Sequence, residues 1–532
     1  MAEAGTWNSA GVRRTRTLAV LVNACSSAGA RVVMMAVGFF VTPYIVHTLS
    51  LQVYGLWSIV GAMASYVFVL DFVLGDAFVK FIVEYVERER RDAVRQVVVF
   101  GMLFYLLFGL TLAIPVWIAT PWLVHLFKMP ASEFSTGVLA FHLLVALFVG
   151  QLVFGPPGMV VTAMQRMDLT NRNNVMSFAA STAMTVVLLH AGWGIYGVIA
   201  GGYTDLVVSA TLKYWTARRL FGPLLCDPRH LERDVIGRLF SFGSWTQLTA
   251  LSNLINQDLP RLIAAGAVSV TSVGFFQLGS KVALTTRTFP GFFVDAILPV
   301  ASAAAARDDS ETVERLYRKG TVYAVIATCA VAGFFSGASE LVMRVWMGPG
   351  YAEAAPVIIA LCVGYVAAST TRIGVTVMRA EGRPKYEALF ALLNAFVSLV
   401  VMITTVPRLG LPGIVIGIAS GSVVGAIGFT IAYHRLVHRP WLTTVGIRCA
   451  RVIALAAITS GLLYFVLATP LAAPLFASRI VGLLGLGLVV ILYLLVFGGL
   501  VVLTSGEGSD ENQLIQKILV RTRLFAAGAL AR

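Results

Sequence analysis

Long apolar stretches separated by short polar connections occupy most of this chain. The stretches that are long enough to cross a bilayer lie at residues 18–47, 53–79, 96–118, 137–163, 175–191, 195–217, 239–263, 272–303, 320–341, 355–378, 387–406, 412–433, 448–469 and 480–504. Because a membrane-crossing helix needs about 20 mainly apolar residues, they predict an all-α polytopic membrane protein with about 14 transmembrane helices. A composition that is 58% hydrophobic and only 12% charged excludes a soluble domain, since the surface of such a domain needs far more charge.

The basic residues fall mainly on one side of this predicted topology. Nearly all of the 40 Lys and Arg residues lie in the two tails, in the even-numbered connections or inside spans, and the odd-numbered connections contain only Lys128, Arg344, Arg408 and Arg479. Since basic residues gather on the cytoplasmic side of a membrane protein, both termini are expected in the cytoplasm. The net charge of +14 then follows from topology and predicts no nucleic-acid partner.

Two halves of the chain resemble each other in order and spacing. Residues 194–199 match residues 410–415 at an offset of 216, and residues 161–164 match residues 375–378 at an offset of 214. Gly55 likewise pairs with Gly274 at an offset of 219. These matches predict two pseudo-symmetric six-helix bundles in parallel topology, an arrangement that usually binds its substrate between the bundles and works by alternating access.

The repeat and the charge pattern together predict the domain organisation. We expect an N-terminal six-helix bundle at 1–217, a cytoplasmic linker at 218–238, a C-terminal six-helix bundle at 239–434, two additional transmembrane helices at 435–504 and a cytoplasmic amphipathic tail at 505–532. Within the twelfth span Gly417, Gly421 and Gly425 are spaced by four. That spacing predicts close packing of this helix against a neighbour.

Ionisable side chains inside the spans indicate a site, because a charge at mid-bilayer costs roughly 2.5 kcal/mol or more unless it faces water or a partner. The basic residues that we predict to bind substrate are Arg31, Arg261, Lys281, Arg287 and Arg372. The acidic residues within spans that we consider with them are Asp71, Asp205 and Asp258. The excess of positive charge predicts a cationic chamber between the bundles, which suits an anionic ligand that passes through.

Each of these acids has two interpretations. Asp258 and Arg261 are three positions apart on one helical face, so they either neutralise each other or belong to the chamber. Asp71 and Asp205 have no basic residue one helical turn away. They are expected either to neutralise an arginine on a neighbouring helix or to bind the proton or cation that drives the return of an empty carrier.

Several segments resemble a known family in order and spacing. Residues 43–57, PYIVHTLSLQVYGLW, resemble the end of the first span and the start of the second in bacterial polysaccharide flippases, with Ser50 where glycine is usual. Residues 70–85 are similar to that family's Leu-Asp-x-Gly segment, with the glycine displaced to Gly75. Residues 164–166 and 378–385 resemble its two intracellular turns. The family resembled is that of the Wzx-type oligosaccharide flippases, whose superfamily also holds lipid II flippases and multidrug and toxin extruders.

This resemblance implies a function and a location. It implies that a lipid-diphosphate-linked oligosaccharide, as used for O-antigen or exopolysaccharide, is turned from the inner to the outer leaflet of a bacterial inner membrane. Coupling to protons or sodium ions, contact with membrane lipid and a polysaccharide polymerase as partner belong to the same expectation. The predicted cationic chamber suits a diphosphate independently of the resemblance.

Two other functions fit a chain with so many spans. A drug/cation antiporter of the same superfamily is disfavoured by the sign of the buried charge and by the span count. A membrane glycan polymerase is disfavoured because the predicted outside connections are short and carry few charges. The sequence contains no phosphate-binding glycine loop and no HExxH, and its five cysteines show no CxxC spacing. We therefore expect no enzyme activity, no cofactor, no metal site and no disulfide.

Overall fold

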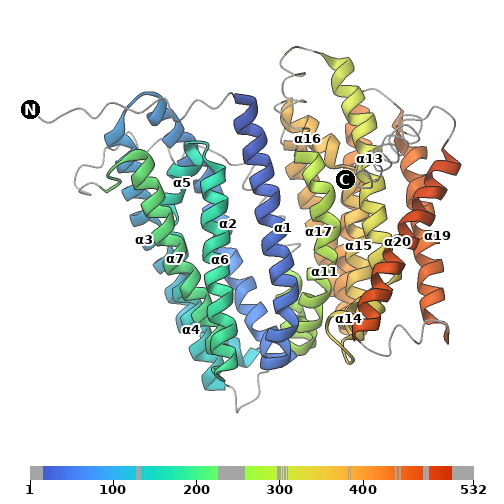
Figure 1. Cartoon of the computed structure of the whole chain (residues 1–532), viewed down its shortest axis with the longest axis horizontal. Helices are drawn as coiled ribbons and strands as arrows, with labels where there is room; N and C mark the ends of the chain where they lie inside the picture. The colour runs from blue at the N-terminus through green and yellow to red at the C-terminus, as the bar shows by residue number, and fades with distance from the viewer. Residues whose placement is uncertain are drawn as a thin grey trace, which may run out of the picture. The chain divides into compact units, whose positions relative to one another are not determined.

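The computed structural model describes residues 16–126, 134–225, 258–295, 309–381, 385–437, 445–470 and 479–505, together with positions 297, 301, 304, 307, 383, 440 and 441. Every regular element within these residues is helical. The chain forms two compact units, Met1–Gln247 and Leu248–Arg532, which we call unit 1 and unit 2 (Figure 1).

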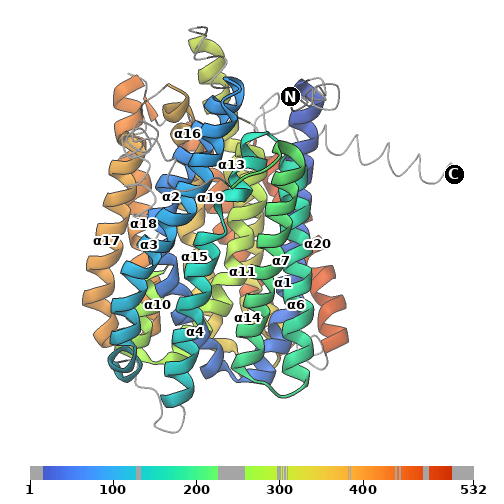
Figure 2. The same cartoon turned by 90° about the vertical axis from the view of Figure 1, so that its left-hand side faces the viewer.

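The helices of unit 1 run side by side in both views (Figures 1 and 2). They are α1 (Arg16–Leu49), α2 (Leu51–Glu87), α3 (Arg91–Leu126), α4 (Phe134–Val153), α5 (Pro156–Ala163), α6 (Met167–His190) and α7 (Ile195–Phe221). α6 packs against α1 and α7, while α4 packs against α3 and α7. Polar bonds join α6 to α7, because Asn173 Nδ2 donates to Thr216 Oγ1 over 3.0 Å.

The helices of unit 2 follow in a similar order. They are α10 (Leu259–Ile263), the π-helical turn η4 (Ala264–Val268), α11 (Val270–Asp295), α13 (Ser310–Gly337), α14 (Ser339–Trp346), the short turn η5 (Ala352–Ala354), α15 (Ala355–Ser369), α16 (Arg372–Ala380), α17 (Lys385–Leu409), α18 (Leu411–Val437), α19 (Ile447–Ala468) and α20 (Arg479–Thr504). α13 packs against α11, α15 and α19, and α18 packs against α15 and α17.

The all-helical membrane fold predicted from the sequence is confirmed. Among the described residues, 10 helices are long and apolar enough to cross a membrane. The predicted spans at 53–79, 175–191 and 272–303 fall on α2, α6 and α11, which are outside these 10. Most of the predicted seventh span, the linker beyond residue 225 and the tail beyond Ser505 lie outside the described residues. The total of fourteen spans and the domain limits therefore stay predictions.

The internal repeat predicted from the sequence recurs in the order of the helices. α2 begins at Leu51 and α11 begins at Val270, 219 positions later. α3 and α13 begin at Arg91 and Ser310, again 219 positions apart, and α18 begins 216 positions after α7. The starts of these helices thus keep the offsets found in the sequence, while unit 2 adds α14 and η5 between α13 and α15 and continues with α19 and α20.

The predicted fourth and tenth spans, which are equivalent in the repeat, are both interrupted. The fourth divides into α4 and α5 around Gly155, and the tenth divides into α15 and α16 at 370–371. Pro156 and Pro157 explain the first break, because proline has no backbone N–H to continue the ladder of helical hydrogen bonds. At the second break no proline is present, and the hydroxyl groups of residues 369–371 donate to carbonyl oxygens three positions earlier, over 2.7, 2.7 and 3.0 Å. Such bonds compete with the helical pattern and end α15.

The glycines of the predicted twelfth span have the packing role expected of them. A Cβ atom added at Gly421 would lie 2.5 Å from the carbonyl oxygen of Asn394, and one added at Gly425 would lie 2.9 Å from Cβ of Asn394. Gly417 faces Met402 in the same way. The absence of side chains on α18 therefore lets α17 approach closely, which confirms the prediction.

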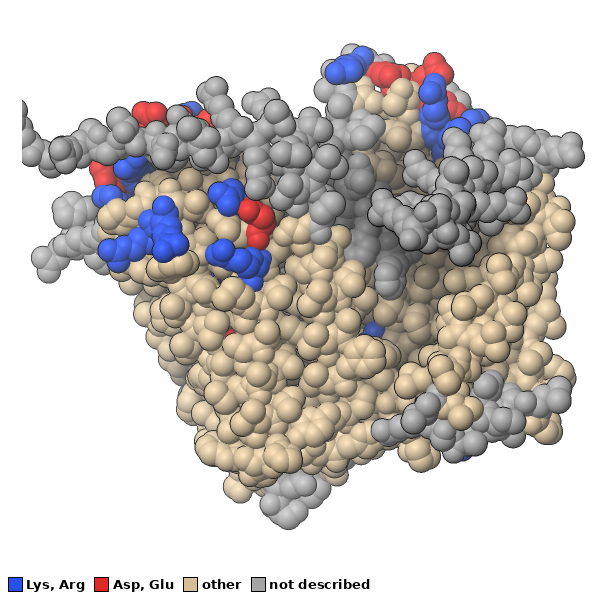
Figure 3. All heavy atoms as spheres, viewed as in Figure 1, with Lys and Arg blue, Asp and Glu red and all other residues tan. Residues whose placement is uncertain are grey.

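Charged side chains of unit 1 gather at one end of its helices. On the face shown in Figure 3, blue and red atoms lie near one edge of unit 1 and nearly all of the remaining surface is tan. Ion pairs at this end include Arg88 with Glu84 at 3.0 Å and Arg166 with Asp168 at 2.9 Å. Large apolar side chains elsewhere are open, as shown by Phe40, which is 74% exposed. Such an apolar belt is the surface that lipid tails cover.

Candidate functional site

Three of the predicted basic residues come together within unit 2. Arg261, Arg287 and Arg372 lie on α10, α11 and α16, and the charge of each acts on the hydroxyl of Tyr365 in α15. We call these three arginines and Tyr365 the Tyr365 cluster. Four elements that are distant in the sequence therefore bring three positive charges near one half-buried phenol group.

A direct bond fixes the position of one of these arginines. Arg372 is the first residue of α16, and its Nη1 donates to the backbone carbonyl oxygen of Arg287 over 3.1 Å. A guanidinium has five N–H donors in a planar fork, so this bond uses one of them. The break between α15 and α16 thereby sets Arg372 against the α11 backbone.

The acid predicted near this cluster is paired with one of its arginines. Asp258, which is 8% exposed, accepts a hydrogen bond from Arg261 Nη1 over 2.9 Å. This is the pairing of positions i and i+3 that the sequence offered as one alternative. The Nε atom of Arg261 is buried and has no hydrogen-bond partner among the described residues. The Nη1 atom of Arg261 is thus paired with a carboxylate, while its Nε atom remains a buried donor that could bind a ligand.

A polar stripe runs along one face of α11. Its members lie on the same side of the helix: Gln277, Ser280, Lys281, Arg287 and Thr288, with the apolar Leu284 between Lys281 and Arg287. Gln277 Oε1 and Ser280 Oγ are buried without a hydrogen-bond partner among the described residues. The stripe therefore places two polar groups without a described partner next to Lys281, on the face that also carries Arg287.

The other face of α11 is packed against protein. Val282 and Ala283 are fully buried, and Thr286 Oγ1 lies 3.5 Å from Cys362 Sγ of α15. Leu284 on the polar stripe is by contrast 43% exposed. The two faces of α11 therefore differ, because one is packed against α15 and the other is in part open.

The remaining predicted site residues lie in unit 1. Arg31 is an exposed residue of α1. Asp205 of α7 is half-buried and has no hydrogen bond or ion pair with any residue that the structure describes. Asp71 belongs to α2, and its side chain lies outside the described part of the chain. Among the described residues, no arginine pairs with Asp205, although its interpretation as a neutralising acid requires such a partner.

Comparison with known proteins decides the family. The model of the family described as "Polysaccharide biosynthesis protein" matches residues 48–356. The chain belongs to this family. The matched region includes α2 to α7 and also α10, α11 and α13, so it contains Arg261, Lys281 and Arg287. The family resemblance inferred from the sequence is thereby confirmed at this level.

Solved structures with a similar fold are membrane proteins. The lipid II flippase MurJ in an inward closed conformation aligns with a TM-score of 0.69 and 12% identity, over 91% of this chain and 99% of that chain. An inward-facing MATE family transporter of the MOP superfamily aligns with a TM-score of 0.58 and 15% identity, over 80% and 95% of the two chains. An uncharacterized membrane protein of Methanocaldococcus jannaschii is 18% identical over 390 residues, which are 70% of this chain and 76% of that protein. At these identities the likeness shows a shared fold.

Three residues of the candidate site were not predicted from the sequence, namely Gln277, Ser280 and Tyr365. Gln277 and Ser280 carry a signal that was present in the sequence, because they stand four and one positions before Lys281 on the same helical face. Tyr365 carries none, since a single tyrosine in an apolar span is ordinary. Its place among three arginines follows only from the packing of α15 against α11.

Proposed function

We propose that this protein moves a lipid-diphosphate-linked oligosaccharide from the inner to the outer leaflet of a bacterial plasma membrane by alternating access, as a step of cell-surface polysaccharide synthesis. The observation that carries the proposal is the Tyr365 cluster, in which Arg261, Arg287 and Arg372 lie near enough to one phenol group to act on it electrostatically and Arg372 bonds the backbone of Arg287. A diphosphate presents several anionic oxygens, and the planar fork of arginine binds such groups in pairs of hydrogen bonds.

The electrostatic cost of the cluster supports an anionic ligand. Each arginine placed at mid-bilayer costs roughly 2.5–3.5 kcal/mol on insertion scales, and like charges that act on one point also repel one another. The paired acid, Asp258, offsets part of the charge of Arg261. A diphosphate bound among the three guanidinium groups would offset the rest during transport.

The α11 stripe supports a ligand that is more than a diphosphate. Gln277 Oε1 and Ser280 Oγ have no partner among the described residues, and both groups form good hydrogen bonds with hydroxyl groups. A sugar joined directly to the diphosphate would reach them when the phosphates lie near Arg287. Lys281, which follows Ser280 and precedes Arg287 on the same helix, adds a further positive charge.

The return of the empty carrier needs an energy source. We propose that a proton or sodium gradient, or the membrane potential, supplies it, with Asp205 and Asp71 as the candidate coupling residues. Asp205 supports this role because a half-buried carboxylate without a partner among the described residues has capacity to bind a cation. A polysaccharide polymerase that acts on the delivered units is the expected functional partner.

A second candidate is ion-coupled antiport of drugs or organic cations, which the shared fold with MATE transporters supports. The charge of the Tyr365 cluster opposes it, because an organic cation would be repelled by three arginines. The two candidates separate by charge reversal of the site. Arg287→Glu should favour export of cationic dyes only if the antiport function is correct.

The proposal is tested in a strain that lacks the gene for this protein. We expect single lipid-linked repeat units to accumulate on the inner leaflet, and plasmid-borne wild-type protein to restore surface polymer. Arg287→Ala and Arg372→Ala should fail to restore it at normal protein levels. Arg315→Ala is the matched control, since Arg315 forms an exposed pair with Glu311, and such pairs contribute little. Accumulation of units on the outer leaflet would instead indicate a polymerase.

A further inference from the structure

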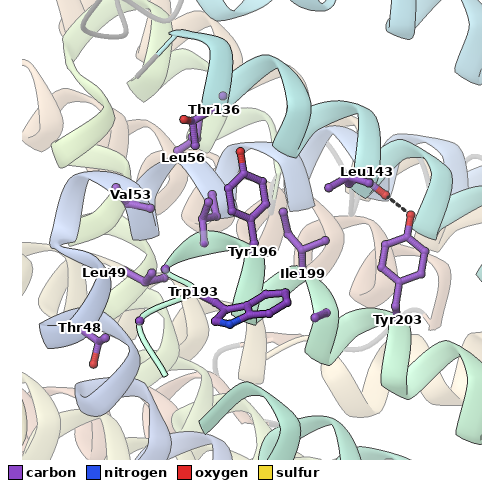
Figure 4. Close-up of a pocket in the computed structure, with 15 residues that line it drawn as sticks. Thr48, Leu49, Val53, Leu56, Thr136, Leu143, Trp193, Tyr196, Ile199 and Tyr203 are labelled. Atoms are coloured by element: carbon purple, nitrogen blue, oxygen red, sulfur yellow. Dashed lines mark hydrogen bonds between the residues drawn. The ribbon is translucent and has the colours of Figure 1, made fainter. Parts of the chain in front are cut away.

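A cavity of about 940 Å³ lies within unit 1, at the end where α1 meets α2 and α6 meets α7. It is lined by the end of α1, the start of α2, part of α4 and the first turns of α7 (Figure 4). The charge pattern of the sequence predicts that this end lies outside the cytoplasm. Its volume falls in the range of roughly 300–1,000 Å³ that is usual for small-molecule sites.

Aromatic rings and uncharged polar groups form the walls of this cavity. Figure 4 shows the rings of Trp193, Tyr196 and Tyr203 along it, and the 15 residues drawn include no charged side chain. The hydroxyl of Tyr203 is already used, because it donates to the carbonyl oxygen of Leu143 over 2.8 Å. No described residue forms a hydrogen bond with the indole of Trp193, the hydroxyl of Tyr196 or the hydroxyl of Thr136. Three side chains therefore offer hydrogen bonds into an otherwise apolar space.

The floor of the cavity adds backbone donors. The turn between α6 and α7 contains Gly192 and Gly194, both with positive φ, and no atom lies within 4 Å of where their Cβ atoms would be. α7 begins after Gly194 without a side-chain cap. The first backbone N–H groups of a helix have no partner inside the helix. Gly197 N already donates to the carbonyl oxygen of Gly194 over 3.0 Å, so the backbone can contribute through the N–H groups that precede Gly197.

We infer that this cavity binds an uncharged sugar ring of the transported glycan, an assignment that rests on the proposed function. A pyranose ring has an apolar C–H face that packs on an aromatic ring, and hydroxyl groups at its edge that both donate and accept hydrogen bonds. The diphosphate is excluded because no cation lines the cavity. A polyprenyl chain is disfavoured because it would leave the donors of Trp193, Tyr196 and the α7 N-terminus unsatisfied.

The ordinary explanation of Trp193 is a membrane anchor, since tryptophan is frequent at the headgroup level and its side chain is 57% exposed. Trp122 of α3 gives a matched comparison, because it is 66% exposed and does not line the cavity. A pure anchor role predicts similar consequences for both tryptophans. A sugar site predicts a consequence for Trp193 alone.

The experiment uses the full chain in lipid nanodiscs and saturation-transfer NMR with glucose, galactose, rhamnose and N-acetylglucosamine. At least one of these sugars should show transfer to its ring C–H protons. Trp193→Ala and Tyr196→Ala should each weaken that binding by roughly tenfold, Trp193→Phe should restore part of it, and Trp122→Ala should leave it unchanged. Arg287→Ala should keep sugar binding while losing export, so a failure of the site and a failure of the proposed function are distinguishable.

Two results would overturn the assignment. The first is that none of the four sugars gives a Trp193-dependent signal although the same preparation restores export in cells. The second is that a short polyprenol binds in a Trp193-dependent manner and no sugar competes with it, which would make the cavity a site for the lipid tail.

Discussion

Arg372 of α16 donates a hydrogen bond from its Nη1 atom to the backbone carbonyl oxygen of Arg287 in α11, over 3.1 Å. The two arginines are therefore neighbours, but only the side chain of Arg372 takes part in this bond. The guanidinium of Arg287 forms no hydrogen bond with any residue in the described part of the chain. Under the proposed function, Arg372 would both connect the two helices and contribute charge, whereas Arg287 would contribute charge alone.

This difference predicts unequal effects of lysine at the two positions. Arg287→Lys should retain much of the glycan export, because the positive charge is kept. Arg372→Lys should lose roughly tenfold, because a single ammonium cannot hold the carbonyl and also present a planar fork to an anion. Export is measured as surface polymer per amount of membrane protein. Equal effects of both substitutions would show that the bond to the Arg287 carbonyl has no role.

The pair between Asp258 and Arg261 predicts a specific pattern of rescue. Asp258→Asn leaves Arg261 without its described partner in a largely buried place. It should lower the free energy of unfolding by about 2 kcal/mol, and with it the amount of folded protein in the membrane. The double variant Asp258→Asn with Arg261→Gln removes both charges and should restore the protein level. If Arg261 also binds the diphosphate, the double variant folds and exports little. Full export would assign the pair to structure alone.

The proposed role of Asp205 and Asp71 in energy coupling can be tested by substitution. Asp205→Asn should reduce export and remove its dependence on external pH or on sodium, because an amide binds neither a proton nor a cation. A purely structural acid would instead be rescued when the arginine that it neutralises is also changed. Asp71→Asn is measured in parallel. An Asp71→Asn protein that exports normally, with unchanged dependence on pH and sodium, is excluded from coupling.

Ser50 predicts a stabilising substitution. Its φ of 78° and ψ of 154° lie in a region that is almost confined to glycine and costs about 1–3 kcal/mol for other residues. Its side chain accepts only a long bond, 3.4 Å, from Val53 N. Ser50→Gly should therefore raise the melting temperature of the purified protein by about 2 °C.

The repeat supplies the control for this substitution. Ser269 stands 219 positions after Ser50 and precedes α11 as Ser50 precedes α2, but its φ of −168° is ordinary extended backbone. Its Oγ accepts from Ser272 N over 3.1 Å. Ser269→Gly should lower stability by a few tenths of a kcal/mol through loss of this bond. A rise in melting temperature for Ser269→Gly would remove the backbone explanation for Ser50→Gly.

The predicted orientation is checked by labelling single cysteines in a cysteine-free background. Ser132→Cys, in the predicted outside connection, should react with an impermeant reagent in intact cells. Arg90→Cys, at the exposed turn between α2 and α3, should react only after the cells are opened. The reverse pattern would place both termini outside.

The sequence contained most of the fold because the membrane requires apolar runs of a set length. The predicted span 195–217 became α7, Ile195–Phe221, with the same start, and the constant offset between repeats recurs in the helix starts. The interruption of the tenth span was not predictable, because serine and threonine hydroxyls also occur in uninterrupted helices. The glycine usual at position 50 in the resembled family now has a physical reason, namely the positive φ of this turn.

The candidate sites were less accessible from the sequence. Ionisable residues in apolar spans are conspicuous, so Arg261, Arg287 and Arg372 were found by their cost in a membrane. The cavity of unit 1 has no such signal. Leu56 of α2, Thr136 of α4 and Trp193 of the turn between α6 and α7 are distant in the sequence, and only the packing of helices brings them to one space.

The two interrupted spans differ in what opens the ladder of backbone hydrogen bonds. At Pro156 and Pro157 the gap belongs to the backbone, because these residues have no N–H to donate. At 370–371 every residue has a backbone N–H, and three side-chain hydroxyl groups bond the carbonyl oxygens instead. At equivalent positions of the repeat, one interruption is thus set by covalent structure and the other by side-chain bonds that a change of rotamer would release.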